Sequence, residues 1–308
     1  MAPVDPKLFK LSAPAWRWVI FAGALTAAST GATIALGLAI GTITAQVLGE
    51  ATPNWTVFAL AWTVLVAAAV GLATWEVCER LRESDWQVPR PVLILGGQLM
   101  VWLSAYWGID GLVMGLAATL MLLLVVRLFL HGMAEAPRNW LRDVAVGVFV
   151  MMWIPFFAAL AVQLVRMDNP WGVDPRLVIV TFMIGVISND VGGYAAGVMF
   201  GKHPMAPKVS PKKSWEGFGG SLVLATITGA LCAIFMLHAP WWQGIVLGIA
   251  LVISATLGDL MESQFKRDLG IKDMSSILPG HGGLMDRLDG MLPSAAMTWL
   301  ILQLFSLV

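Results

Sequence analysis

The stretch from Asp259 to Asp289 reads DLMESQFKRDLGIKDMSSILPGHGGLMDRLD. It lies between two long apolar runs and carries acidic and basic side chains in close succession. Because most of the remaining chain is apolar, this dense run of both charge signs indicates a reaction site held at a membrane surface. The alternative is a solvated loop with ordinary surface ion pairs.

Residue spacing gives this polar stretch a regular geometry. If the helix that enters it continues past Asp259, then Asp259, Glu262 and Lys266 share one helix face, because positions i, i+3 and i+7 do so. Asp286 and Asp289 would likewise share a face at the start of the next helix, where the helix dipole favours acids. The spacing therefore predicts two small groups of carboxylates, one at each end of the stretch.

The residue types in this stretch suit phosphate and metal chemistry. Carboxylates are the hard oxygen ligands that Mg²⁺ takes beside substrate phosphates. Positive charge for a polyphosphate is offered by Lys266, Arg267, Lys272 and Arg287. The glycines around His281 allow a tight turn that exposes backbone N–H groups. His281 has no second histidine or cysteine at metal-binding spacing, so it either donates to a phosphate or caps the turn.

Three blocks of the chain resemble a known family. The pattern S-x-F-K-R-x4-K-D-x-S-x2-L-P-x-H-G-G-L-x-D-R-L-D, from Ser263 to Asp289, is similar to the signature of the phosphatidate cytidylyltransferases, also called CDP-diacylglycerol synthases. The run SPKKSWEG from Ser210 resembles the family's S-P-K-K-[ST]-x-E-G motif, and NDVGGY from Asn189, followed by Gly201 and Lys202, resembles its D-x-x-[AG]-Y block. The resemblance covers residues 175–308.

The resemblance implies transfer of the cytidylyl group of CTP to phosphatidate, with Mg²⁺ and with or without a second cation. The metal ligands that we predict are Asp190, Asp259, Asp286 and Asp289. The predicted catalytic residues are Lys266, Arg267, Lys272, Asp273, His281 and Arg287. The predicted substrate-binding residues are Ser210, Lys212, Lys213, Ser214, Glu216 and Ser263. Glu216 is expected either to bind metal or to orient a lysine.

Composition places the chain among polytopic membrane proteins. Of its 308 residues, 58% are hydrophobic and 12% are charged, and the mean hydropathy is +0.79. The formal net charge is zero, which implies no bulk attraction to nucleic acid. The two cysteines, Cys78 and Cys232, lie in apolar surroundings and are predicted to be packing residues.

The apolar runs predict an all-α fold with about nine transmembrane helices. They are expected at 15–48, 57–75, 91–107, 111–130, 143–165, 177–199, 219–237, 241–258 and 291–308. The first run is long for one crossing and would form two short spans as the alternative. Residues 1–174 are predicted to be scaffold, a lipid access route or a dimer contact, and residues 175–308 to be the catalytic region.

The distribution of basic residues predicts the topology. With nine crossings and an inside N-terminus, every Lys and Arg except Arg166 and Arg176 lies on the inside, as the positive-inside rule requires. The 200–218 loop and the 259–290 stretch then share the cytoplasmic face, where soluble CTP is available. We expect an inner-membrane protein of a bacterium, with the active site facing the cytoplasm.

Asp190 lies inside an apolar run, where a lone charge costs about 2.5–3.5 kcal/mol on insertion scales. It therefore predicts a functional position, although a carboxylate bonded to Asn189 or Ser188 for helix packing is the alternative. Gly192 and Gly193 would let another helix or a ligand approach closely.

Two other kinds of function remain open from the sequence. A related enzyme would use another lipid, either as a CTP-dependent polyprenol kinase or as a cytidylyltransferase acting on an archaeol-like phosphate. A transporter would place Asp190 on an ion pathway, usually near the membrane midplane and with an internal repeat, which this sequence lacks. The expected partners are CTP, phosphatidate and membrane lipids, with no nucleic acid and with a homodimer as an option.

Overall fold

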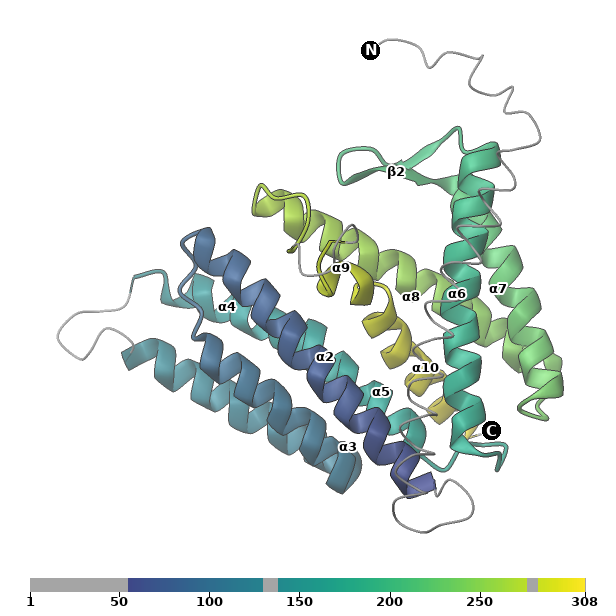
Figure 1. The fold of residues 1–308 in the computed structure, drawn as a ribbon, viewed down its shortest axis with the longest axis horizontal. Helices are drawn as coiled ribbons and strands as arrows, with labels where there is room; N and C mark the ends of the chain where they lie inside the picture. The colour runs from purple at the N-terminus through teal and green to yellow at the C-terminus, as the bar shows by residue number, and fades with distance from the viewer. Residues whose placement is uncertain (1–54, 130–137, 276–281, 308) are drawn as a thin grey trace.

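The computed structural model describes residues 55–129, 138–275 and 282–307, and these are mostly helical (Figure 1). The helices of the first half are α2 (Trp55–Glu83), α3 (Arg90–Phe129), α4 (Trp140–Met151), the π-helical turn η2 (Met152–Phe156) and α5 (Phe157–Arg166). The second half contains α6 (Pro175–Phe200), strands β1 (Pro204–Ala206) and β2 (Ser210–Ser214), α7 (Trp215–Phe235), α8 (Trp241–Asp268), α9 (Met285–Leu288) and α10 (Met291–Phe305).

Helix α3 is a hairpin of two antiparallel arms. Gly108 breaks the helix with φ 68° and ψ −142°, a conformation that glycine tolerates. Beyond this bend the chain folds back, so that a Cβ on Gly96 would lie 1.9 Å from Thr119 Cγ2. The two arms correspond to the predicted spans 91–107 and 111–130, which are therefore confirmed as separate helical segments.

Seven helices in the described part of the chain are long and apolar enough to cross a membrane, counting α3 once and the continuous α4–η2–α5 segment once. The α4–η2–α5 segment contains Pro155, whose missing N–H the π-helical turn accommodates. The predicted span 15–48 lies outside the described residues, so the count of nine stays a prediction. The helical class is confirmed, and the small β1–β2 hairpin within the 200–218 loop was not predicted.

The helices pack into two adjoining cores. One core joins α2, α3, η2 and α5, and it includes Met274 and Met285 from the polar stretch. The other joins α5, α6, α7, α8 and α10. Helices α6 and α7 cross closely, because a Cβ on Gly192 would lie 2.6 Å from the carbonyl oxygen of Gly220. The predicted close approach at Gly192 is thus confirmed as a helix–helix contact. Both cysteines are buried and not disulfide-bonded.

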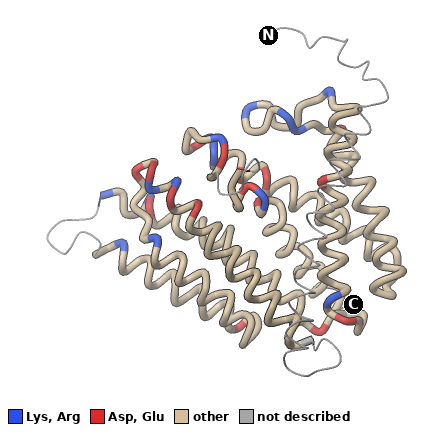
Figure 2. The backbone as a smooth tube through the Cα atoms, viewed as in Figure 1, with Lys and Arg blue, Asp and Glu red and all other residues tan. Residues whose placement is uncertain are grey.

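Most charged residues lie at one end of the helical bundle, and a smaller group lies at the opposite end (Figure 2). The more highly charged end carries the β1–β2 hairpin, the end of α8, and the neighbouring ends of α2, α3 and α4. One of the ion pairs here is buried: Arg127 and Asp143 join α3 to α4 at 2.7 Å, with side chains 0% and 1% exposed. The bundle therefore has a polar end beside a long apolar body, the form expected of a membrane protein with a site at its surface.

Candidate active site

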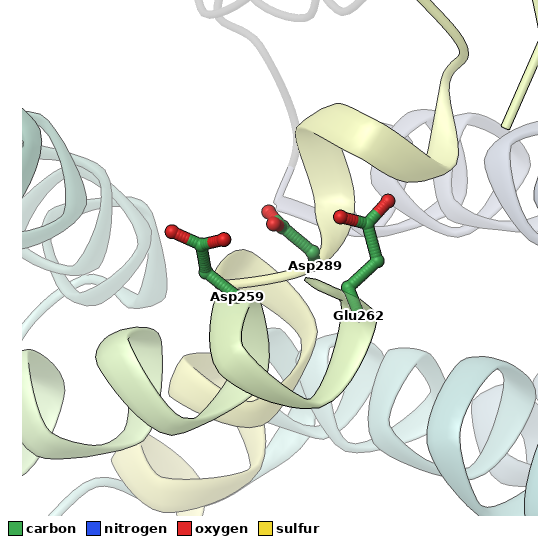
Figure 3. Close-up of side chains that lie close together, drawn as sticks. All are labelled: Asp259, Glu262 and Asp289. Atoms are coloured by element: carbon green, nitrogen blue, oxygen red, sulfur yellow. The ribbon is translucent and has the colours of Figure 1, made fainter. Parts of the chain in front are cut away.

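The two ends of the polar stretch meet in space. Helix α8 continues ten residues past the apolar run predicted at 241–258 and ends at Asp268, shortly before Gly270 at φ 68°. Asp259 and Glu262 therefore occupy one face of α8, as the spacing predicts. Asp289, directly after α9, comes to the same place, and all three residues offer oxygen atoms within 4.8 Å of one another (Figure 3).

Glu262 is the buried member of this acidic cluster, which we define as Asp259, Glu262 and Asp289. Its side chain is 1% exposed, and its Oε2 atom pairs with Lys266 one turn later on α8. Its Oε1 atom is buried without a hydrogen-bond partner among the described residues. A buried carboxylate oxygen in this state is costly unless a cation or a polar ligand satisfies it.

Asp286 was predicted to bind metal, but its two carboxylate oxygens have other partners. Asp286 Oδ1 accepts a hydrogen bond of 2.8 Å from Lys266 Nζ. Asp286 Oδ2 accepts from the backbone N–H groups of Met274, at 3.0 Å, and Gly283, at 2.7 Å. Asp286 thus ties two segments of the loop between α8 and α9, at Met274 and Gly283, to Lys266, and through Lys266 to Glu262.

The β1–β2 hairpin carries the second basic side of the site. Lys213 Nζ lies 2.5 Å from Asp259 Oδ2. Ser214 caps α7 by accepting a hydrogen bond of 3.1 Å from the N–H of Gly217. Glu216 accepts from the backbone N–H groups of Lys202 and His203 and contacts His203 Nδ1 at 2.5 Å. Ser214 and Glu216 thus hold the hairpin in place, and Lys213 reaches the acidic cluster.

A polar cavity of about 250 Å³ lies between the hairpin and the acidic cluster. The charged side chains that line it are Asp190, Lys212, Lys213, Asp259, Arg287 and Asp289. An apolar cavity of about 440 Å³ adjoins it, with walls from α2, α5, α6 and α10. The two cavities share Val186, Asp190, Arg287 and Met291. A charged compartment and an apolar one therefore meet at Asp190 and Arg287.

The remaining predicted site residues lie around this centre. Asp190 accepts a hydrogen bond of 3.1 Å from Asn189 Nδ2, which the packing alternative anticipated, yet it also lines both cavities. Ser263 Oγ lies 3.4 Å from Asp259 Oδ1. Arg267 donates to the carbonyl oxygen of Val209 at 3.3 Å. The others are Ser210, half-buried at the start of β2, Lys272 and Asp273, both exposed, and His281, which lies outside the described residues.

One buried carboxylate at the site was not predicted. Glu76 of α2 is 1% exposed and accepts hydrogen bonds from Ser275 and from the backbone N–H groups of Leu284 and Met285. A signal was present, because Glu76 is the first acid after the long apolar run that begins α2. Its partners are about 200 positions away, and no local pattern identifies contacts across that distance.

The fold and this site together define a class: a helical membrane protein whose clustered carboxylates and lysines suit binding of a cation and phosphates. Comparisons with known proteins agree. Residues 22–305 match the model of the cytidylyltransferase family. The chain is 45% identical over 282 residues to the phosphatidate cytidylyltransferase of Mycobacterium bovis, covering 89% of this chain and 88% of that protein.

Two further relatives show how widely this similarity extends. The phosphatidate cytidylyltransferase of Mycobacterium leprae is 45% identical over 285 residues, with 89% of this chain and 87% of that protein covered. The enzyme of the same name from Brucella melitensis is 38% identical over 152 residues, with 49% of this chain and 54% of that protein covered. The chain belongs to the cytidylyltransferase family, and the predicted family resemblance is confirmed.

Proposed function

We propose that this protein transfers the cytidylyl group of CTP to phosphatidate, giving CDP-diacylglycerol and pyrophosphate. Two relatives named phosphatidate cytidylyltransferase are 45% identical to this protein over 89% of the chain. The observation that carries the proposal is the acidic cluster between Lys213 and Lys266, beside an adjoining apolar cavity. This arrangement suits a reaction between a soluble polyphosphate and a lipid.

The reaction joins two anions, so the protein must neutralise charge and align the reactants. A phosphate oxygen of phosphatidate attacks the α-phosphorus of CTP, a new P–O bond forms, and the bond to the bridging oxygen breaks as pyrophosphate leaves. Lys212 and Lys213 line the polar cavity and supply positive charge for the triphosphate. The attacking phosphate is already ionised at neutral pH, so the step needs no strong general base.

The residues at the centre fit a divalent cation. Asp259, Glu262 and Asp289 present hard oxygen donors within 4.8 Å of one another, and Glu262 Oε1 is buried without a partner among the described residues. These three would hold Mg²⁺, with Asp190 near enough to the cavity to assist a second cation. A bound Mg²⁺ would supply neutralisation of the charge that develops on the leaving pyrophosphate. In this assignment Asp286 instead orders the loop between α8 and α9.

The apolar cavity supports a lipid substrate in this proposal. Residues such as Trp62, Phe182 and Leu292 give it a hydrocarbon-like lining, which suits acyl chains. Arg287 borders both cavities and would contact the phosphate of the lipid where its acyl chains enter. The headgroup would then lie beside the triphosphate while the acyl chains stay in the membrane.

The protein would lie in the inner membrane of a bacterial cell, with the site facing the cytoplasm. Support comes from the basic residues, which gather at the end of the bundle that carries the site. The location of the site at the end of the bundle argues against a transporter, because a transporter would place its polar site near the middle of the bundle. A homodimer is compatible with these features and is part of the proposal only as an option.

Comparing three lipid acceptors with the purified protein tests the assignment. Separate detergent micelles would contain phosphatidate, a polyprenol or an archaeol-like phosphate, each with CTP and Mg²⁺. We expect rapid consumption of CTP with phosphatidate and slow consumption with the others. The variant Asp289→Asn should be inactive with all three. Preference for polyprenol would instead assign the kinase alternative.

A further inference from the structure

The loop between α8 and α9 receives a carboxylate from the first half of the chain. Glu76 Oε1 accepts hydrogen bonds from Ser275 Oγ at 2.6 Å and from Leu284 N at 2.9 Å, and Glu76 Oε2 accepts from Met285 N at 2.8 Å. One side chain of α2 therefore binds the loop at two places, at Ser275 and at Leu284–Met285. Its two oxygens receive three donors from positions about 200 residues later in the chain.

Neighbouring contacts reinforce this clamp. Arg80, one turn along α2, donates through Nε to the carbonyl oxygen of Met274 at 2.5 Å. Met274 and Met285 are both 0% exposed and pack into the core that contains α2. Gly283 passes so close that a Cβ there would lie 3.0 Å from Glu76 Oε2. The ends of the loop are thus fixed on α2 by hydrogen bonds and by buried side chains.

The position of this clamp connects it to the acidic cluster. Met285 opens the short helix α9, and Asp289 follows four residues later, one helical turn on. The separation between Asp289 and Asp259 therefore depends on where Met285 is held. Asp286, which pairs with Lys266, is set by the same turn.

We propose that Glu76 is a positioning residue for the transferase site: it holds α9 so that Asp289 stands opposite Asp259 and Glu262. This role rests on the proposed function. It gives the first half of the chain a direct part in building the site, beyond scaffold or lipid access. Glu76 does not line either cavity, so it acts through the loop and does not touch the substrates.

The variant Glu76→Gln tests this role at nearly constant volume. An amide has one acceptor oxygen, so it keeps either the Met285 bond or the bonds to Ser275 and Leu284, and it presents an N–H₂ group to the other side. We expect kcat to fall about ten- to a hundred-fold, the size of losing a hydrogen bond to a buried charged group. Glu79→Gln is the matched control, because Glu79 is on the same helix and pairs with Arg82 and Arg90 instead.

Hydrogen exchange followed by mass spectrometry provides a readout that does not depend on activity. In Glu76→Gln the peptide that contains Leu284 and Met285 should exchange at least tenfold faster, while α6 and α7 keep their wild-type exchange. Glu79→Gln should match the wild type throughout. Wild-type exchange at Leu284 and Met285 would overturn the proposal, and so would equal acceleration in α6 and α7, because that would show a general loss of stability.

A milder variant covers the case in which Glu76→Gln does not fold. Ser275→Ala removes one donor and leaves the Glu76 carboxylate and both backbone bonds in place. It should lower kcat a few-fold and raise exchange in the peptide that contains residue 275. Unchanged kcat and exchange would overturn the role. If the wild type proved inactive with CTP and phosphatidate, the proposed function would fail, while the exchange results would still decide whether Glu76 holds the loop.

Discussion

Lys213 Nζ lies 2.5 Å from Asp259 Oδ2, which joins the β1–β2 hairpin directly to the acidic cluster on α8. The basic segment that ends β2 and the acidic segment on α8 therefore lie side by side, although 46 positions separate the two residues. On the opposite side of the cluster, Lys266 pairs with Glu262 and Asp286. The carboxylates thus lie between two lysines from different segments.

This arrangement predicts that Lys213 and Lys266 act as one unit. Lys213→Met should lower kcat/KM for CTP by about a hundred-fold, since one preorganised positive group is lost. Lys266→Met should have a similar effect, and the double variant should be less than additive, with a coupling energy of about 0.5–3 kcal/mol. Steady-state kinetics at fixed phosphatidate measure all three.

Lys208 provides the control for this cycle, because it is exposed in the same hairpin loop and does not line the polar cavity. Lys208→Met should keep near wild-type kinetics. Full additivity of Lys213→Met and Lys266→Met would indicate two separate sites and would remove the hairpin from the chemistry.

The acidic cluster predicts where a divalent cation binds. Asp259→Asn and Asp289→Asn should each abolish turnover and weaken Mn²⁺ binding, measured by electron paramagnetic resonance, because an amide removes charge at nearly constant volume. Asp268→Asn is the control, since this exposed residue at the end of α8 bonds to Gln264. Wild-type Mn²⁺ affinity in Asp289→Asn would exclude Asp289 from the cation site.

Asp286 distinguishes the two assignments made from sequence and from structure. If it orders the loop, Asp286→Asn should lower kcat yet keep near wild-type Mn²⁺ affinity. A loss of Mn²⁺ binding as severe as in Asp289→Asn would restore Asp286 to the predicted ligand set.

The buried ion pair between Arg127 and Asp143 predicts a stability effect away from the site. Arg127→Met should cost about 3 kcal/mol in the free energy of unfolding, at the low end for breaking a buried pair, because Asp143 stays buried and keeps only the half-exposed Arg142 as a charged partner. The double variant with Asp143→Leu should recover part of this loss. Arg82→Met is an exposed comparison and should cost at most about 1 kcal/mol. Denaturant unfolding in detergent checks these values, and equal costs for the two single variants would contradict the burial argument.

The basic residues predict the orientation in the membrane. A cysteine added after Val308 should react with an impermeant thiol reagent from the outside only, in a background where buried Cys78 and Cys232 stay unreactive. Labelling from the cytoplasm would contradict the nine-span topology with an inside N-terminus.

The sequence predicted those parts of the molecule that depend on local pattern. Apolar runs located the helices. The spacing of Asp259, Glu262 and Lys266 predicted a shared face if the helix continued past Asp259, and α8 does continue, to Asp268. Sequence blocks resembling a family marked the segments from Ser210 and from Ser263 as candidate parts of the site, without indicating that the first forms a hairpin. Each of these features is set by residues that lie close together in the sequence, so it can be predicted without knowing how the helices pack.

Contacts between distant segments escaped the same reasoning. Glu76 belongs to an apolar helix of the first half, and only packing of α2 against the loop reveals its role. Glu262 was predicted to share a helix face with Asp259 but was not predicted as a cation ligand, because its burial depends on neighbouring helices. Asp286 and Asp289 looked equivalent in sequence, yet the loop amides engage only the first.

The position of a radioactive label in CTP tests the central claim most directly. Purified protein with phosphatidate and Mg²⁺ would receive CTP labelled either at the α- or at the γ-phosphorus. Cytidylyl transfer predicts that the α label enters the lipid fraction and that the γ label leaves as pyrophosphate, with neither reaction in Asp289→Asn. Entry of the γ label into lipid, or no entry of the α label, would contradict the account.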